Sequence, residues 1–404
     1  MKRHFDVLLL GVLALTSCME RSELYCKKHP DDPVYCQTQV DAPTSCSSNA
    51  ECATPTAVCD LNIMACVECT PADANACVGA SPVCGDDRAC RGCEAHDECA
   101  SKACLPDGSC ADAGTVAYVS PTGSDNASCT LAMPCTDVAD ALATDRAYVK
   151  ISGTNDEGST VDINNQDVTI LADPGAKLVR TSNGVVLEIR GTSQVTIYDL
   201  EISGGSGAGG IGISLPTGNT ASLTLTRGRI LLNYGGGISI SGGRFDITNT
   251  FIVQNGGPTS TIGGVTFSNI SGAGPHRFEF NTVAANAGGA TVHTGISCGT
   301  VLVPLVFSNN IVYGNAVSGG GKQFGGSTNC STTYSDIGPD ATPGTGNINE
   351  DPQFVSLQQG NFHLAATSPA RDAADPSSTL PDDVDGDVRP QGAARDMGAD
   401  EATP

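Results

Sequence analysis

Five related hexads occur between residues 200 and 315: Leu200-Glu201-Ile202-Ser203-Gly204-Gly205, Gly228-Arg229-Ile230-Leu231-Leu232-Asn233, Thr250-Phe251-Ile252-Val253-Gln254-Asn255, Asn281-Thr282-Val283-Ala284-Ala285-Asn286 and Asn310-Ile311-Val312-Tyr313-Gly314-Asn315. The third position is always Ile or Val, and the sixth is Asn in four of the five hexads. Successive third positions are 28, 22, 31 and 29 residues apart. A repeat of this period is typical of a solenoid, in which each turn packs on its neighbours.

Short runs of alternating apolar residues precede the hexads, and each run predicts a strand whose inward side chains lie two residues apart. The runs are Val195-Thr196-Ile197, Leu223-Thr224-Leu225, Phe245-Asp246-Ile247 and Phe278-Glu279-Phe280. No stretch of this region has a helical apolar period, so repeats built from helices are excluded. The fold class that fits is all-β, a parallel β-helix.

Stacked turns place like residues in columns. We expect each repeated Asn to bond the turns above and below it and to occupy left-handed backbone, and glycine pairs to form the corners. The register also predicts that Asp199 stacks on Arg227, and Glu201 on Arg229, as ladder ion pairs on the surface.

Both ends of this region resemble known β-helix proteins. Tyr118-Val119-Ser120-Pro121-Thr122-Gly123-Ser124-Asp125, followed by the candidate helix Thr136-Asp137-Val138-Ala139-Asp140-Ala141-Leu142, resembles the entry cap of right-handed parallel β-helix proteins of the pectate-lyase-like superfamily. Asp351-Pro352-Gln353-Phe354, Asn361-Phe362-His363-Leu364, Ser368-Pro369-Ala370-Arg371-Asp372-Ala373, Asp383-Val384-Asp385-Gly386-Asp387-Val388-Arg389-Pro390-Gln391 and Asp396-Met397-Gly398-Ala399-Asp400-Glu401 resemble the C-terminal signature of the choice-of-anchor Q group of bacterial surface proteins. Arg371 departs from the aliphatic residue usual there. The resemblance implies a right-handed β-helix with a C-terminal cap over residues 113–401, and a surface location more than a particular chemistry.

The N-terminus has the features of an export signal. A basic start, Met1-Lys2-Arg3-His4, precedes an apolar run from Val7 to Leu15 that is too short to span a bilayer. Leu15-Thr16-Ser17-Cys18 resembles the lipobox of bacterial lipoproteins, which implies a signal peptide over residues 1–17 and acylation of Cys18. Met19 follows Cys18 where an Asp would favour the inner membrane, so the resemblance implies an outer-membrane lipoprotein, with the membrane as partner through its lipid. Residues 18–45 then form a linker.

Twelve cysteines divide residues 46–112 into three short modules. They are Cys46, Cys52, Cys59 and Cys66; Cys69, Cys77, Cys84 and Cys90; and Cys93, Cys99, Cys104 and Cys110. Modules of this length bury little apolar surface, so we expect disulfides to replace a core, and an exported chain keeps them oxidised. The spacing leaves the three connectivities within each module open. The remaining natural pairs are Cys26 with Cys36, Cys129 with Cys135 and Cys298 with Cys330, which leaves Cys18 for the lipid.

Two other interpretations of the modules remain. Cys66-x-x-Cys69 and Cys90-x-x-Cys93 match a zinc-ribbon template, although each pair straddles a module boundary. The modules are expected to act as a stalk; a protein-binding module is the alternative.

The chain carries 44 acidic and 21 basic side chains, a formal net charge of −23. This balance excludes nucleic acid as a partner, since phosphate binding requires clustered Lys and Arg. It also disfavours an acidic polysaccharide, which like charge would repel.

Lyase chemistry on this fold, as the resemblance implies it, uses carboxylates that hold calcium and an Arg or Lys base. The basic candidates are Arg227, Arg229, Arg244, Arg277 and Lys322, and the acidic ones are Asp199, Glu201, Asp246 and Glu279. No column stacks several acids beside a base. Asp246 and Glu279 on neighbouring turns are the glycosidase candidates, His276 and His293 are interpreted as loop or packed residues, and Tyr198, Tyr234 and Tyr313 could stack on sugars in a chain without Trp.

The tail contains a cluster of acids with two interpretations. Asp383, Asp385 and Asp387, with Asp382 beside them, are candidate Ca2+ ligands, although the EF-hand spacing fails. Alternatively, Arg389 and Arg395 pair with Asp396, Asp400 or Glu401 in a cap that closes the last coil.

These observations predict a surface protein that binds a glycan or a surface partner without catalysis, and Ca2+ is its candidate cofactor. The alternatives are a carbohydrate-active enzyme, either a polysaccharide lyase or a glycosidase, and a surface spacer.

Overall fold

The computed structural model describes residues 45–289, 293–317 and 323–403. Residues 1–17, which are predicted to be a signal peptide, lie outside the described residues, as do Cys18, Cys26, Cys36 and Lys322. The chain divides into two compact units, one formed by the cysteine-rich modules and the other by Ala100–Ala103 and Ala111–Pro404. Within the described ranges, no helix has the length and apolar character needed to cross a bilayer.

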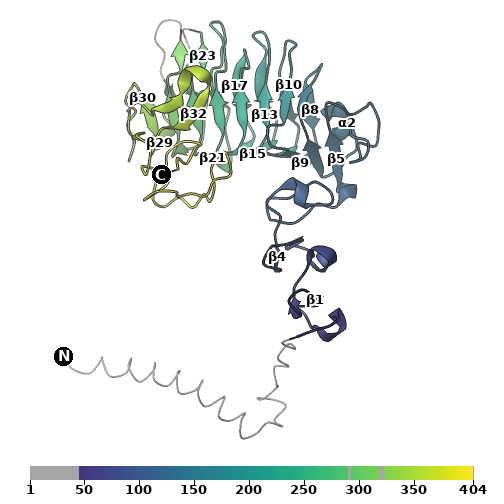
Figure 1. The fold of residues 1–404 in the computed structure, drawn as a ribbon. Coiled ribbons are helices and arrows are strands. Elements are labelled where there is room, and N and C mark those ends of the chain that lie inside the picture. The colour runs from purple at the N-terminus through teal and green to yellow at the C-terminus, as the bar shows by residue number, and fades with distance from the viewer. Residues whose placement is uncertain (1–44, 290–292, 318–322, 404) are drawn as a thin grey trace, which may run out of the picture. The chain divides into compact units, whose positions relative to one another are not determined.

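The second unit is a parallel β-helix of three sheets, which confirms the predicted fold class (Figure 1). Sheet 1 has eight strands: β7 (Thr154–Asp156), β10 (Lys177–Val179), β13 (Glu201–Ser203), β16 (Arg229–Leu231), β19 (Phe251–Val253), β22 (Thr282–Ala284), β26 (Ile311–Tyr313) and β30 (Asp336–Gly338). Sheet 2 has seven: β8 (Val161–Asn164), β11 (Leu187–Arg190), β14 (Ile211–Leu215), β17 (Gly236–Ser241), β20 (Val265–Ser268), β24 (Ile296–Cys298) and β28 (Phe324–Gly326). Sheet 3 has nine: β5 (Val116–Val119), β6 (Tyr148–Ile151), β9 (Asp167–Ala172), β12 (Gln194–Tyr198), β15 (Ser222–Thr226), β18 (Arg244–Thr248), β21 (His276–Glu279), β25 (Leu305–Ser308) and β29 (Cys330–Thr333).

Positions two to four of every hexad form a strand of sheet 1. The third position points into the coil, and the Ile or Val there is fully buried at all five hexads. Positions two and four therefore face outward. Aromatic rings fill the later turns of the core, where Phe267 lies 4.6 Å from Phe245 and 5.1 Å from Phe307 between ring centroids.

Two ladders of side-chain amides flank the strands of sheet 1. In the first, Asn233, Asn255 and Asn286 each donate a backbone N–H to the Oδ1 of the next Asn along the coil, and Gln323 ends the series above Asn315. A second ladder at the first hexad position runs through Thr250, Asn281, Asn310, Ser335 and Asn347. The predicted bonding between turns is confirmed.

The left-handed residues are not the ladder asparagines, which corrects the expectation. They occupy the fifth hexad position, as in Gln254 (φ 57°) and Ala285 (φ 55°), and the residue just before the hexad, as in Asp199 (φ 63°). The chain turns each corner at the residue next to a ladder position. The ladder Asn itself must keep its amide aligned with the next turn to complete the ladder.

Helix α2 (Val138–Ala143) confirms the helix expected near the entry of the coil. Its buried residues Val138, Ala141 and Leu142 pack on the first strands, as Figure 1 shows beside β5. The last coil is bonded to the following chain, where Ile337 donates to the carbonyl of Ile348. Two short strands, β23 (Ala287–Gly288) and β27 (Ala316–Val317), pair outside the three sheets.

The buried carboxyl group of Asp336, on this last turn, leads us to expect that the stability of the fold depends on pH. Its Oδ1 accepts from the Glu350 N–H, its buried Oδ2 has no hydrogen-bond partner, and burial raises its pKa to about 7. The ordinary value is 3.8, so at intermediate pH the folded chain holds a proton that the unfolded chain has lost. The free energy of unfolding should therefore fall as pH rises from about 4 to about 7. Urea unfolding at a series of pH values should show a shallower fall between pH 6 and 7 for Asp336→Asn; an unchanged profile would contradict this account.

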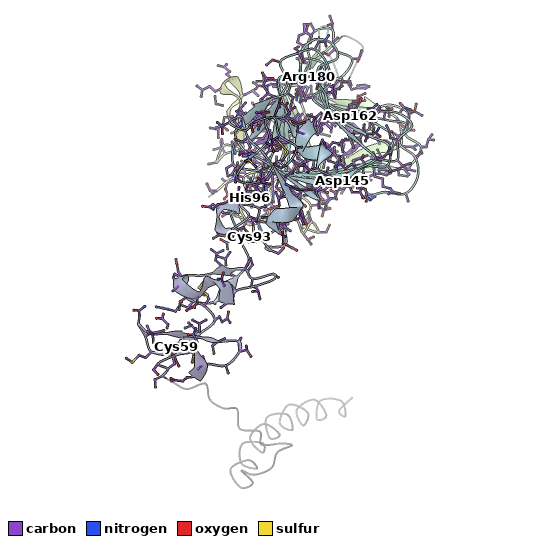
Figure 2. All side chains as sticks on the ribbon, turned by 90° about the vertical axis from the view of Figure 1, so that its right-hand side faces the viewer. Cys59, Cys93, His96, Asp145, Asp162 and Arg180 are labelled. Carbon is purple, nitrogen blue, oxygen red and sulfur yellow. A yellow bond between two sulfur atoms is a disulfide. The ribbon has the colours of Figure 1, made fainter. Side chains whose placement is uncertain are left out.

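Each cysteine module holds two disulfides, connecting its first cysteine to the third and its second to the fourth. The pairs are Cys46–Cys59, Cys52–Cys66, Cys69–Cys84, Cys77–Cys90, Cys93–Cys104 and Cys99–Cys110. Figure 2 labels Cys59 in the first module and Cys93 in the third. The cysteines of the zinc-ribbon template thus have disulfide partners, and Cys129–Cys135 and Cys298–Cys330 are bonded in the coil.

Secondary structure in the modules is short. It consists of η1 (Asn49–Glu51), β1 (Val58–Asp60), β2 (Ala65–Val67), η2 (Pro71–Ala76), β3 (Val83–Cys84), β4 (Cys90–Arg91) and η3 (His96–Glu98), and η4 (Ala113–Thr115) precedes the coil.

Candidate functional site

The outer face of sheet 1 changes character along the coil. At β13 and β16 the second hexad positions are Glu201 and Arg229, whereas from β19 onward the outward residues are mostly apolar. The C-terminal segment, which we define as residues 354–403, covers the apolar part. It begins with a hairpin of β31 (Phe354–Ser356) and β32 (Asn361–Leu364), joined by η5 (Leu357–Gln359).

Two apolar clusters hold the C-terminal segment on this face. One includes Phe280 and Ile311 of the coil with Leu364 and Met397 of the segment. The other joins Phe251, Val253 and Ala284 to Phe362, Val384 and Ala399. The predicted cap thus lies along the side of the coil, as Figure 1 shows for β32 beside the later strands, rather than across its last turn. The reason is physical: the outward apolar residues of β19, β22 and β26 leave water by packing against the apolar residues of the segment.

Arg389 is the centre of this segment. Its buried guanidinium pairs with buried Glu401 at 2.9 Å, donates to the carbonyls of Asp382, Asp396 and Gly398, and lies 4.6 Å from the ring centroid of Phe280. The expected pairing of Arg389 is formed with Glu401. Arg395 instead donates to the Leu380 carbonyl. Phe280, expected to face the interior, is the left-handed residue of its corner and turns outward beneath Arg389.

At the edge of the C-terminal segment, charged side chains form what we call the charged row: Lys177, Glu201, Arg229, Asp385 and His363. Lys177 Nζ lies 3.0 Å from Glu201 Oε2, and Arg229 Nη2 lies 2.5 Å from Asp385 Oδ1. His363 Nε2 is 2.7 Å from Asp385 Oδ2. Side-chain exposure is between 15% and 40%, so the row is accessible to solvent.

A second group lies beside this row. Arg227 bonds both carboxylate oxygens of Asp199, at 2.6 and 2.9 Å, and reaches Asp382 at 2.7 Å. The predicted Asp199–Arg227 ladder pair is formed. Glu201 and Arg229 are also register partners, but each pairs elsewhere because Lys177 and Asp385 offer closer opposite charges.

The other candidates for lyase or glycosidase chemistry lie apart from one another or are bound to other side chains. Arg277 pairs with Asp246 at 2.7 Å, while Glu279 accepts from Asn309 and Ser378. Asp246 is thus opposite Arg277, and Glu279 is opposite Thr248 in the register. The glycosidase candidates Asp246 and Glu279 therefore have separate partners, and these contacts do not bring them together as a catalytic pair.

The histidines and tyrosines have separate environments. His276 packs 5.2 Å from Phe245 between ring centroids, and burial lowers its pKa, so it is a packed residue as expected. Tyr198 lies beneath Arg227 and Tyr313 packs under the C-terminal segment, whereas Tyr234 is 43% exposed. His293 and Arg244 lie elsewhere in the coil, away from the charged row in sequence and register.

The candidate calcium ligands have different environments. Asp383 is buried and its two oxygens accept backbone N–H groups of Asp385, Asp387 and Glu401, so it shapes a turn. Among the described residues, and apart from three groups of disulfide-bonded cysteines, ligand atoms converge at His363, Asp385 and Asp400, all within 4.8 Å of one another. A second convergent group is Asp125, Asp137 and Asp140 near the entry.

The pKa values of the three groups in this cluster are shifted in different directions. The hydrogen bond from His363 lowers the pKa of Asp385, and the same bond raises that of His363. Burial raises the pKa of Asp400 to about 6. His363 and Asp400 were not identified as site residues from the sequence, since three residues spread over 38 positions of the C-terminal segment meet only when that segment folds. One signal was available: the outward hexad positions become apolar from Phe251 onward, which indicates that something covers them.

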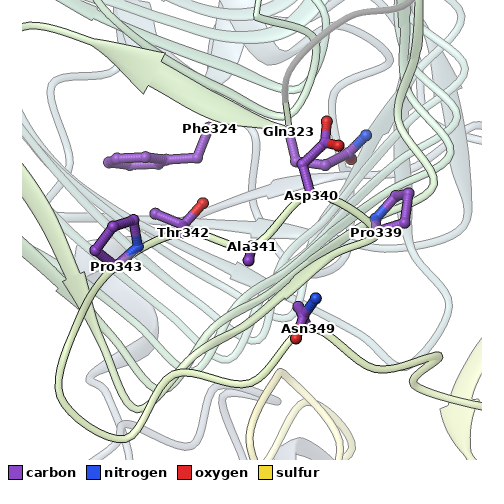
Figure 3. Close-up of a pocket in the computed structure, with 8 residues that line it drawn as sticks. All are labelled: Gln323, Phe324, Pro339, Asp340, Ala341, Thr342, Pro343 and Asn349. Atoms are coloured by element: carbon purple, nitrogen blue, oxygen red, sulfur yellow. The ribbon is translucent and has the colours of Figure 1, made fainter.

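A cavity of about 670 Å³ lies at the last turn, next to β28. Figure 3 shows Phe324 and Pro343 on one side of it and Gln323 and Pro339 on the other. Its size would admit a small ligand. The amide of Gln323 is occupied by Asn315, with which it closes the first ladder, and Asp340, Thr342 and Asn349 are the other polar residues that line the cavity.

No known family profile matches the chain, and no curated protein matches it. Among solved structures, it is similar to the crystal structure of pectate lyase Pel9A, with a TM-score of 0.43 and 14% sequence identity. The match covers 71% of this chain and 96% of that chain. No residue role is transferred from that enzyme to this chain.

Proposed function

We propose that this protein is an exported lipoprotein of the outer-membrane surface whose β-helix binds a neutral glycan, without catalysis, at the charged row. The observation that carries the proposal is the row itself, in which Lys177, Glu201 and Arg229 succeed one another on adjacent strands. Neighbouring strands lie about 4.8 Å apart, so hydrogen-bond donors and acceptors alternate at a spacing close to the length of one sugar unit. Such charged groups can bond several hydroxyls of a neutral chain.

Export is supported by the disulfides, since eight are formed among the described residues and disulfides persist in oxidising compartments. A neutral ligand is supported by the net charge of −23, which repels polyanions. Binding rather than catalysis is supported by the ion pairs of Arg227, Arg229 and Arg277, because a paired, fully charged guanidinium is a poor base.

The test uses the full-length protein on arrays of neutral and acidic glycans, followed by titration calorimetry with the best ligand. Lys177→Gln and Glu201→Gln should each weaken binding about tenfold, the value of one hydrogen bond to a charged group. Arg190→Gln is the matched control, since Arg190 also pairs with an acid, Asp162, on the outer face of sheet 2 (Asp162 is labelled in Figure 2).

The same samples are assayed for unsaturated products and new reducing ends, with calcium and with chelator. Binding that survives both row variants, or no binding by folded protein to any glycan, would overturn the proposal. Product formation would establish the enzyme alternative.

A further inference from the structure

We propose that His363, Asp385 and Asp400 form a binding site for a divalent transition-metal ion such as Zn2+. The ligand atoms are His363 Nε2, Asp385 Oδ2 and Asp400 Oδ1. Nε2 lies 2.7 Å from Asp385 Oδ2 and 4.0 Å from Asp400 Oδ1. An ion bound at about 2.1 Å from each ligand would place them about 3.4 Å apart, so each separation needs to change by less than about 1 Å.

Each proposed ligand is oriented by a second contact, made through the side-chain atom that does not face the site. His363 Nδ1 donates to Asn361 Oδ1 at 2.7 Å, and Asp385 Oδ1 accepts from Arg229 at 2.5 Å. Asp400 Oδ2 accepts from the Leu364 N–H at 2.7 Å. In each case this contact leaves the proposed metal-binding atom of the side chain directed at the point that the three ligands share. Metal ligands in proteins are oriented by outer contacts of this kind.

Asn361 orients the imidazole. Its Oδ1 accepts the backbone N–H of His363 at 3.1 Å and lies 2.7 Å from the ring Nδ1, which holds Nε2 toward the two carboxylates. A bound ion would take the place of the proton through which Nε2 contacts Asp385.

Asp400 completes the site. Its side chain is 8% exposed, its Oδ2 accepts the Leu364 N–H, and its Oδ1 faces His363 Nε2 at 4.0 Å. A metal ion would bond this oxygen together with His363 and Asp385.

The donor set selects the class of ion. One imidazole with two carboxylates suits Zn2+, Mn2+ or Co2+, whereas Ca2+ takes six to eight oxygen ligands. The site shares only Asp385 with the Asp383–Asp385–Asp387 group predicted from the sequence. It also shares His363 and Asp385 with the charged row, but metal binding is tested without a glycan, so the two proposals can fail separately.

The test is titration of the oxidised full-length protein with Zn2+, following bound metal by equilibrium dialysis. We expect tight binding of one ion that is weakened at least 100-fold in His363→Asn and Asp400→Asn. Asn361→Ala, which removes the outer support of the imidazole, should weaken binding 10- to 100-fold. Asp162→Asn, the control on sheet 2, should bind as wild type does.

Co2+ substitution identifies the ligands. A visible absorption band without sulfur-to-metal charge transfer is expected for nitrogen and oxygen ligands. Circular dichroism checks that each variant is folded. The proposal is overturned if folded wild type binds no Zn2+, if both ligand variants retain wild-type affinity, or if the Co2+ spectrum shows cysteine ligation.

Discussion

Arg389→Met is expected to release the C-terminal segment from sheet 1 while the coil itself stays folded. The substitution leaves Glu401 buried at 0% exposure without its counter-charge, and it removes three hydrogen bonds to carbonyl groups. Breaking a buried ion pair on one side costs about 3–5 kcal/mol. In a solenoid this loss should remain local, because each part contacts only its neighbours.

The measurement is limited proteolysis combined with hydrogen exchange. In Arg389→Met, cleavage within residues 354–403 should become at least 100-fold faster, while amides of sheet 2 keep their protection. The double variant Arg389→Met/Glu401→Leu should recover part of the loss, since it no longer buries an unpaired charge. Arg190→Gln, at an exposed ion pair, should change stability by at most about 1 kcal/mol. Wild-type protection of the segment in Arg389→Met would refute its central role.

Asn286→Ala is expected to be the most damaging single change within the ladders. Asn286 Oδ1 accepts from both the backbone N–H and the Nδ2 of Asn255, and its own Nδ2 donates to the Ile252 carbonyl and to Asn315. Alanine leaves at least two buried donors unpaired, at about 1–3 kcal/mol each. We therefore expect a loss of at least about 3 kcal/mol in the free energy of unfolding of these turns.

The matched control is Asn164→Ala, at an exposed asparagine on the outer face of sheet 2, which should change stability by no more than about 0.5 kcal/mol. Hydrogen exchange locates the effect: the Asn255 amide should exchange much faster in Asn286→Ala. Equal protection of this amide in both variants would show that the ladder contributes little.

The hexads explain how much of the fold was predictable. A branched residue at the third position with strands on either side has one low-energy arrangement, in which Ile202, Ile230 and their equivalents stack inside the coil. The sequence also predicted the Asn ladder, since an amide repeated once per turn can satisfy the backbone above and below. It did not predict that Gln254 and Ala285, rather than the ladder asparagines beside them, are left-handed, because neither residue type favours that conformation.

The candidate site was less predictable. The column of Asp199 and Arg227 followed from the repeat, but the partners of Glu201 and Arg229 did not, because Asp385 comes from a different part of the chain. Asp383 looked like a metal ligand beside other acids, whereas its oxygens are used by backbone N–H groups of the turn.

The sequence by itself therefore determined the turns of the coil, whose register follows from a local period, and the cysteine-rich character of the modules. Only the tertiary structure decided the disulfide connectivity, the outward turn of Phe280 and the meeting of His363, Asp385 and Asp400. The physical reason is that stacking in a solenoid depends on residues one repeat apart, which a single sequence displays. The position of the C-terminal segment depends on the apolar outer face of sheet 1, and that face exists only after the coil has formed.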